Sequence, residues 1–289
     1  MTELLTPATA PAATSLTTAR IPRRARLRHF LMCRPDFFDV TYSINPWMNP
    51  AKPTSNALAV AQWEVLHNLL VSLGHHVQTI DPDPALPDMV FAANGATVVD
   101  DKVLVARFRH PERDGESAHY VDWFRAQGFA EVVQAAYPNE GEGDYLTTGR
   151  AILAGNGFRS DPRSQAEATE LFGRPVVGLQ LVDPRFYHLD TALAVLDQDE
   201  VMYYPAAFSQ ESRAVLRALF PDAVIATEAD AVVFGLNAVS DGLNVILPEA
   251  ATGLAAQLRE RGFRTHGVDL TELLKAGGSA KCCTLELRH

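Results

Sequence analysis

Apolar and polar positions along this 289-residue chain follow a unit that recurs. In residues 89–106 two apolar runs flank Asp100-Asp101, a pattern typical of a β-hairpin. An amphipathic helix is predicted over residues 116–127, where Gly128 can end it, and a short apolar strand follows at 131–133. Hairpin, helix and strand in this order predict one compact α/β module.

The same order returns at intervals of roughly 40–60 residues, a spacing typical of repeat architectures. Hairpins are predicted over 145–153, 191–204 and 231–247, helices over 164–172, 211–220 and 250–261, and third strands over 175–182, 223–227 and 265–268. A helix over 57–73, capped by Asn56, lies between apolar runs at 29–33 and 75–80, and a strand over 283–287 closes the chain. Recurring hairpins favour repeated ββαβ modules over the plain alternation of a doubly wound sheet.

Composition indicates a globular protein with a substantial core, since 47% of the residues are hydrophobic and 21% are charged. The formal charge of −10 argues against nucleic acid or an anionic membrane as a partner. Three cysteines, two of them adjacent, form no disulfide framework and favour a reducing cytoplasm. No apolar run approaches the roughly 20 residues that span a bilayer.

Residues 1–27 form an Ala-, Thr- and Pro-rich stretch that we expect to be a disordered leader. This stretch lacks the apolar segment of a secretory signal, and its arginines leave an organelle transit peptide as the alternative. Residues 28–289 contain no internal linker, and we expect them to form a single domain.

The stretch that suggests chemistry most directly is Lys281-Cys282-Cys283, immediately before the last strand. A cation beside a thiol favours the thiolate, which is the reactive form. The alternative is a buried structural pair, because free cysteine is among the most buried residue types.

Four further patches carry unusual polar residues. Asn94 lies in an amide-glycine turn, and Glu140, Glu142 and Asp144 are separated by glycines in a loop that does not match a calcium-binding EF-hand. The alternatives there are a plain turn and a solvated acidic loop. The third patch contains Arg159, which either binds a carboxylate or is an ordinary surface arginine. The fourth contains His188 and Asp190, whose side chains would lie on the same face if this segment were extended.

Motifs for zinc, nucleotides and serine hydrolases are absent from the sequence. A Cys–His–acid arrangement remains, in which a thiolate assisted by a base attacks an electrophilic carbon.

Three segments, Glu-Gly-Glu-Gly-Asp, His-Leu-Asp-Thr and Gly-Gly-Ser-Ala-Lys-Cys-Cys-Thr, occur in that order. This ordered set resembles the guanidino-group-modifying (pentein) superfamily, which includes arginine deiminase, dimethylarginine dimethylaminohydrolase and the amidinotransferases. The resemblance runs from about His29 to the end. It implies a five-bladed α/β propeller of ββαβ modules with pseudo-fivefold symmetry, in agreement with the repeat.

The resemblance also implies roles for the catalytic residues. Cys282, rather than Cys283, matches the nucleophile, and His188 matches the general acid/base. Glu142 matches the acid that orients the histidine or holds the guanidinium. Glu140 is its rival, because the usual Glu-Gly-Gly-Asp motif is one residue shorter than this loop.

Substrate contacts are implied in the same way. Asp144 and Asp190 match contacts to the guanidinium or amine. Arg159 matches the arginine that binds the substrate carboxylate, and Arg113 a second one, with Arg109 as a competitor.

The departure from the superfamily pattern is Asn94, where deiminases and dimethylarginine enzymes generally have an acid. Asn94 together with Asn45, in the segment Asn-Pro-Trp-Met, resembles the arginine dihydrolase branch. We therefore expect hydrolysis of free arginine to ornithine, carbon dioxide and two ammonia molecules.

The alternatives are dimethylarginine dimethylaminohydrolase, arginine deiminase and, in a different class, a non-catalytic amino-acid-binding module. The expected partner is a small arginine-like substrate, without cofactor, metal, nucleic acid or membrane, in a chain that can form a homo-oligomer.

Overall fold

The computed structural model describes residues 22–289, which contain five three-stranded sheets. In each sheet the first strand pairs antiparallel with the second, and the second pairs parallel with the third. The sheets are β3 (Ala96–Val99), β4 (Lys102–Val105) and β5 (Glu131–Gln134); β6 (Tyr145–Thr147), β7 (Ile152–Asn156) and β8 (Val176–Gln180); β9 (Leu193–Asp197), β10 (Glu200–Tyr203) and β11 (Val224–Ile225); β12 (Val239–Ser240), β13 (Asn244–Pro248) and β14 (Arg264–Val268); and β15 (Leu285–Glu286), β1 (His29–Cys33) and β2 (His76–Ile80).

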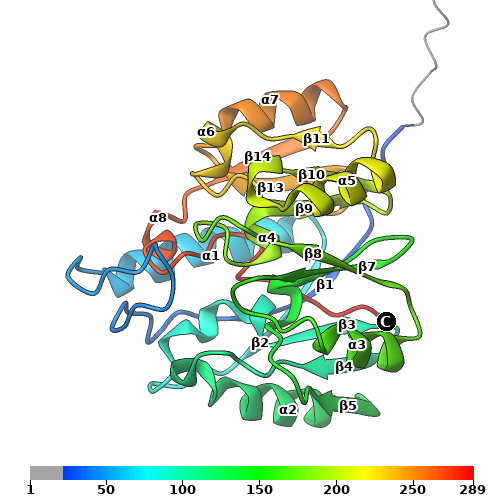
Figure 1. The fold of residues 1–289 in the computed structure, drawn as a ribbon. Helices are drawn as coiled ribbons and strands as arrows, with labels where there is room; N and C mark the ends of the chain where they lie inside the picture. Colours follow the sequence, from blue (N-terminus) through cyan, green and yellow to red (C-terminus); the bar gives the residue numbers. More distant parts are fainter. Residues whose placement is uncertain (1–21) are drawn as a thin grey trace, which may run out of the picture.

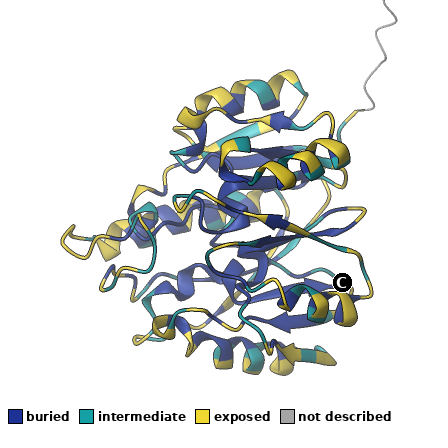
Figure 2. Ribbon diagram, in the orientation of Figure 1, coloured by how far each residue is buried: buried dark blue, intermediate teal, exposed yellow. Residues whose placement is uncertain are grey.

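A helix connects the second and third strand of each sheet, as parallel pairing requires a long crossover. These helices are α1 (Asn56–Ser72), α2 (Glu116–Ala126), α3 (Ser164–Phe172), α5 (Gln210–Leu219) and α7 (Thr252–Glu260). They lie on the outside of the molecule and expose their outer faces, whereas the first two strands of each sheet are largely buried (Figures 1 and 2). The order hairpin, helix, strand confirms the predicted ββαβ module.

Short helical segments occupy the connections between the modules. They are the α-helical turns α4 (Leu189–Ala192), α6 (Glu228–Ala231) and α8 (Thr271–Leu274) and the 3₁₀ turns η1 (Pro87–Val90), η2 (Ala92–Asn94), η3 (Pro111–Arg113), η4 (Gly141–Gly143) and η5 (Pro205–Ala207).

The first strands of the five sheets lie at the centre of the molecule. Strand β15 contacts β3, β6 contacts β9, and β9 contacts β12, so the sheets form the blades of a ring. Strand β15 closes this ring by pairing with β1, with Phe30 opposite Glu286 and Leu31 opposite Leu285. The predicted five-bladed propeller is therefore confirmed.

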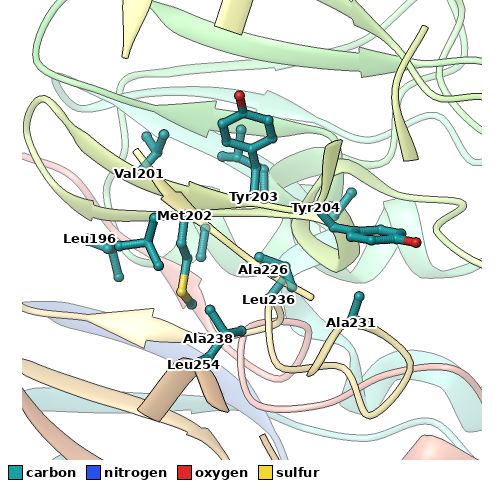
Figure 3. Close-up of a cluster of buried hydrophobic side chains, with 14 of the residues drawn as sticks. Leu196, Val201, Met202, Tyr203, Tyr204, Ala226, Ala231, Leu236, Ala238 and Leu254 are labelled. Carbon is teal, nitrogen blue, oxygen red and sulfur yellow. The ribbon is translucent and has the colours of Figure 1, made fainter. Parts of the chain in front are cut away.

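Apolar side chains fill the spaces within and between neighbouring blades. In the largest cluster, Leu196 and Met202 of the third blade lie against Leu236, Ala238 and Leu254 of the fourth (Figure 3). Burial of such side chains contributes roughly 1.5–3 kcal/mol each for the larger ones. This packing fixes the position of one blade relative to the next, and with it the loops at the centre.

Several predicted elements differ from the structure. Strand β12 has only two residues, because Ala231–Ala238 takes an irregular path in which Phe234 has a φ of 61°. Residues 87–94 form 3₁₀ turns before strand β3. Helix α1 is capped by Ser55, whose hydroxyl accepts a hydrogen bond from the Leu58 amide, and Asn56 is its first residue.

Most of the predicted leader, residues 1–21, lies outside the described residues. At its end, Arg23 forms a salt bridge with Glu200 and Arg26 one with Asp197. The boundary of the single domain at residue 28 therefore remains a prediction, while residues 22–27 already contact the fold.

None of the helices in residues 22–289 combines the length and the apolar character needed to cross a bilayer.

Candidate active site

Buried polar side chains lie within five residues before the first strand of four of the blades, and the nucleophile candidate lies before that of the fifth. Asn94 precedes β3, Glu140 precedes β6, His188 precedes β9, Asn237 precedes β12 and Cys282 precedes β15. Because these strands surround the centre of the ring, the residues at their amino-terminal ends gather at one end of it. The repeat itself therefore creates the site.

Cys282 is held by two neighbouring loops. Its Sγ lies 3.2 Å from Asp190 Oδ2 and 3.1 Å from Asn237 Nδ2, and its backbone amide donates to Asn237 Oδ1 at 3.1 Å. Asn237 also donates to the Asp190 carbonyl. One amide thus fixes both the main chain and the sulfur of the candidate nucleophile.

The surroundings of this thiol disfavour its ionised form. Burial, followed by the charge of Asp190, raises the pKa of the Cys282 thiol well above its usual range. Lys281 does not contact the sulfur, because its Nζ binds Glu142 Oε2 and the Thr284 carbonyl, both at 2.8 Å. Stabilisation of a Cys282 thiolate by Lys281 stays a prediction, and it would act through charge and not through a direct contact.

Two glycines give the segment before Cys282 its close packing. A Cβ on Gly278 would lie 2.2 Å from the ring of Phe91. Gly277 has a φ of 85°, and its carbonyl accepts a hydrogen bond from the Tyr187 hydroxyl. Asn45 donates to the neighbouring Ala276 carbonyl at 3.0 Å. Asn45 therefore contacts the segment that carries the candidate nucleophile, and its expected contact with substrate stays a prediction.

His188 lies at the amino-terminal end of α4, in extended conformation. Residues 189–192 form a helical turn, so the condition under which His188 and Asp190 would share the face of a strand is not met. The Nε2 atom of His188 lies 2.7 Å from Glu140 Oε2. The same oxygen accepts a hydrogen bond from Arg159 at 2.7 Å. Burial lowers the pKa of His188 to about 4 despite the opposing pull of Glu140. The imidazole is therefore neutral at pH 7.

Glu140 remains ionised although it is completely buried. Burial alone would raise its pKa, but Arg159 first and His188 second hold the pKa of this carboxyl below its usual range. Arg159 is buried too, with its guanidinium over the ring of Tyr187 and one nitrogen donating to the Ile44 carbonyl.

Glu142 points away from His188. Its carboxylate forms salt bridges with Lys281 and Arg288 and accepts a hydrogen bond from the Glu286 amide. The contact predicted between His188 and Glu142 is thus made by Glu140, the rival. Gly141, with a φ of 54°, lets the loop turn between the two acids; a Cβ there would lie 2.6 Å from two backbone carbonyls.

Asp144 serves the structure of the loops. It accepts a hydrogen bond from the Ser160 hydroxyl at 2.6 Å and one from the Leu189 amide at 3.1 Å. Both oxygens are occupied, and burial raises the pKa of Asp144 well above its usual range. Asp144 thus fixes the residue after His188, and its expected contact with a guanidinium stays a prediction.

Arg113, expected to be a second carboxylate-binding arginine, is buried behind the site. Its guanidinium pairs with Glu116 and donates to Asn94 Oδ1 at 2.8 Å. Arg109, its competitor, is exposed, and its backbone amide donates to Glu140. Asn94 in turn donates to the Glu140 carbonyl at 3.4 Å.

Several buried polar atoms lack a partner among the described residues, and three of them belong to residues around the candidate site: Asp88 Oδ1, His188 Nδ1 and Asp190 Oδ1. Unsatisfied buried polar groups are uncommon, since each costs about 1–3 kcal/mol. Two are acceptors on acids, and the third belongs to a neutral imidazole. Such a set is suited to a ligand that brings several N–H donors.

Sequence reasoning missed Asn237, Asp88 and Tyr187. A signal for Asn237 exists in the chain, because Phe234-Gly-Leu-Asn237 repeats the spacing of Phe91-Ala-Ala-Asn94 before the first strand of another blade. Asp88, whose Oδ2 accepts from Tyr42, had no such signal.

Within residues 22–289 no group of three or more His, Cys, Asp or Glu side chains is placed to hold a metal ion.

Known proteins are similar to this chain over most of its length. The family described as N,N dimethylarginine dimethylhydrolase, eukaryotic, matches residues 40–289. An N(G),N(G)-dimethylarginine dimethylaminohydrolase of Mycobacterium tuberculosis is 56% identical over 265 residues, which cover 92% of this chain and 87% of that protein.

A bifunctional arginine dihydrolase/ornithine cyclodeaminase, ArgZ of Synechocystis, is 41% identical over 89% of this chain but only 37% of its own length. The crystal structure of the N-terminal domain of ArgZ bound to substrate has a TM-score of 0.87 and 39% identity, covering 91% of this chain and 98% of that domain. A crystal structure of a dimethylarginine dimethylaminohydrolase adduct, at 18% identity and a TM-score of 0.75, shares the fold.

These matches extend over nearly the whole described chain and include its catalytic candidates. The chain belongs to the dimethylarginine dimethylaminohydrolase and arginine dihydrolase family of guanidino-modifying hydrolases.

Proposed function

We propose that this enzyme hydrolyses N,N-dimethylarginine to citrulline and dimethylamine through a covalent intermediate on Cys282. The observation that carries this proposal is the buried thiol between Asp190 and Asn237, beside acceptors that lack a partner among the described residues. The choice of methylated arginine over arginine is supported by the Mycobacterium tuberculosis relative at 56% identity, against about 40% for the arginine dihydrolases.

Binding of the substrate cation activates the thiol. The free carboxylate oxygen of Asp190 accepts an N–H of the guanidinium, and the cation replaces the thiol as the partner of this acid. Since Asp190 is a cause of the raised Cys282 pKa, neutralising its charge makes the thiolate easier to form. Asn237 Nδ2 then donates to the developing negative charge on sulfur.

The thiolate attacks the central guanidino carbon, and the C–N bond to dimethylamine breaks. His188, whose Nδ1 has no partner in the described part of the chain, carries the thiol proton to the departing amine. Glu140 holds the opposite ring nitrogen and so fixes the orientation of the imidazole. Water, deprotonated by His188, then attacks the amidino carbon and releases citrulline and the sulfur.

Arginine dihydrolase remains a second candidate because of Asn94. A neutral amide at this position, instead of an acid, can accommodate an uncharged ureido group for a second attack that ends in ornithine, carbon dioxide and two ammonia molecules. We expect Asn94→Asp to shift any such output towards citrulline.

Product analysis separates these reactions. The protein is incubated separately with dimethylarginine, arginine and citrulline, and products are identified by mass spectrometry. Citrulline and dimethylamine from dimethylarginine support the proposal. Ornithine from arginine, with dimethylarginine untouched, supports the dihydrolase, and absence of turnover with all three contradicts both.

The Cys282→Ser variant tests the nucleophile, with Cys283→Ser as its matched control. Cys283 is buried but is not hydrogen-bonded to Asp190, so its serine variant retains turnover. We expect Cys282→Ser to lose at least about 10³-fold in kcat, since hydroxyl is a far weaker nucleophile at neutral pH. Wild-type turnover in Cys282→Ser would exclude the covalent route.

A further inference from the structure

A cavity of about 270 Å³ lies along the centre of the propeller, away from the catalytic residues. The catalytic residues precede the first strands of the blades, whereas this cavity is lined by those strands and by residues at their carboxyl ends, such as Leu196, Gln198 and Arg288. The catalytic candidates and most of the cavity therefore lie towards opposite ends of these first strands. The ion pairs of Glu142 lie between them, because its partners Lys281 and Arg288 both line the cavity.

The cavity wall carries an excess of positive charge. Four cations line it: Arg28, Arg174, Lys281 and Arg288. Within the described residues they share two carboxylates, Glu286 with Arg28 and Arg288, and Glu142 with Lys281 and Arg288. Asp197, the other acid of the wall, is paired with Arg26, so it neutralises none of the four.

Arg174 is the cation with most capacity for a ligand. It forms no salt bridge with any described acid, and its Nη2 donates hydrogen bonds to the carbonyls of Thr148 and Gly149. Arg28 adds a buried Nε without a partner in the described part of the chain. Two guanidinium groups with unused donors facing a polar cavity suit an oxyanion, which arginine binds through two parallel hydrogen bonds.

The close approach of these cations affects the pKa of Arg288. Burial, and then the charge of Arg28, lower the pKa of Arg288 to about 9. A bound anion would offset that repulsion.

We infer that this cavity is a second ligand site, which binds a small oxyanion of the phosphate or carboxylate class between Arg174, Arg28 and Arg288. Its volume accommodates a compact anion of this kind together with a few waters, at roughly 30 Å³ per water. Lys281 belongs to the cavity wall and directly precedes Cys282, so the site touches the segment that carries the nucleophile.

Calorimetric titration with inorganic phosphate and, separately, with citrate at constant ionic strength tests this inference. The full-length protein is compared with Arg174→Gln, and Arg125→Gln serves as control, since it removes one positive charge from the exposed side of α2. We expect saturable binding that Arg174→Gln weakens about tenfold and Arg125→Gln leaves unchanged, as loss of one charge-assisted hydrogen-bond pair predicts.

The Arg174→Lys variant distinguishes loss of a ligand contact from a folding defect. Because lysine retains the positive charge, this variant should recover part of the anion affinity. Tighter binding of phosphate than of citrate assigns the phosphate class, and the reverse assigns the carboxylate class. Absence of saturable binding for both anions, or equal affinity in wild type and Arg174→Gln, would overturn the inference.

Discussion

Two buried carboxylates in the active site, Glu140 and Asp190, have opposite electrostatic surroundings. Glu140 contacts Arg159 and His188 directly, and its pKa is held below the usual range. Asp190 has the Cys282 thiol as its neighbour and no cation in direct contact among the described residues. Burial raises the pKa of Asp190 to about 6, against a smaller opposing pull from Lys281.

The difference indicates separate tasks. An acid whose charge is already compensated can orient a histidine, but it has little to gain from a substrate cation. An acid that is buried without a cation gains most when a guanidinium arrives. We therefore assign recognition of the substrate cation to Asp190 and support of His188 to Glu140, an assignment that substitutions and pH can test.

The largest effect is expected from Asp190→Asn. Loss of the charge that attracts the guanidinium should reduce kcat/KM by about 10³–10⁴-fold, or roughly 4–5.5 kcal/mol. Because the folded protein disfavours the ionised form of Asp190, the variant should melt at an equal or higher temperature. Steady-state kinetics and thermal unfolding check this, with Asp183→Asn as control in a nearby loop. Near-normal kcat/KM would refute the assignment.

Glu140→Gln should have the next largest effect, because it should lower both kcat and the stability of the fold. We expect kcat to fall about 10²–10³-fold, since the imidazole loses its charged partner. Arg159 then loses its buried counterion, and breaking such a pair costs roughly 3–5 kcal/mol of unfolding free energy. Denaturant unfolding measures this loss, and Glu170→Gln on the exposed side of α3 is the control. Unchanged stability in Glu140→Gln would show that the ion pair is not formed in solution.

The pH dependence of kcat/KM should reveal Asp190 in the free enzyme. Its pKa of about 6 means that the carboxyl is ionised above pH 6 and becomes neutral as the pH falls through that value. kcat/KM should therefore drop about tenfold per pH unit below 6. His188 contributes no loss there, because its pKa of about 4 leaves it neutral. This fall in kcat/KM near pH 6 should be absent from the Asp190→Asn variant. If the variant still shows the fall, another group is responsible for it.

Glu142→Gln should have the smallest effect on catalysis. This side chain lies two residues from Glu140 but pairs with Lys281 and Arg288, outside the contacts of His188. We expect kcat within about threefold of wild type, together with a lower melting temperature because two cations lose their buried partner. A loss of kcat as large as that of Glu140→Gln would restore Glu142 to the role that its sequence motif suggested.

Periodic features of the chain were predictable, and local exceptions to them were not. The hairpin at Asp100-Asp101 and helix α3 agree with prediction because turn chemistry and a helix-ending glycine are local signals. Strand β12 was overestimated because the apolar residues of 231–238 pack into the core without extended pairing.

The identities of the nucleophile and histidine candidates followed from motifs, but the directions of side chains did not. Whether Glu140 or Glu142 faces His188 depends on the backbone at Gly141 and on cations that come from residues 281 and 288. The spacing of residues within one motif does not reveal contacts between segments that are so far apart in the sequence. The same holds for Asn45 and Arg113, whose roles depend on which groups of other blades they meet.

The closure of the ring by β15 and β1 has a consequence for the timing of activity. Strand β15 is synthesised after every other described element, and Cys282 lies three residues before it. The sulfur is therefore expected to reach Asp190 and Asn237 only when the final strand has joined the blade begun by β1. We therefore expect a chain that lacks this strand to have no assembled site, so that completion of the fold is the step that brings Cys282 to its partners.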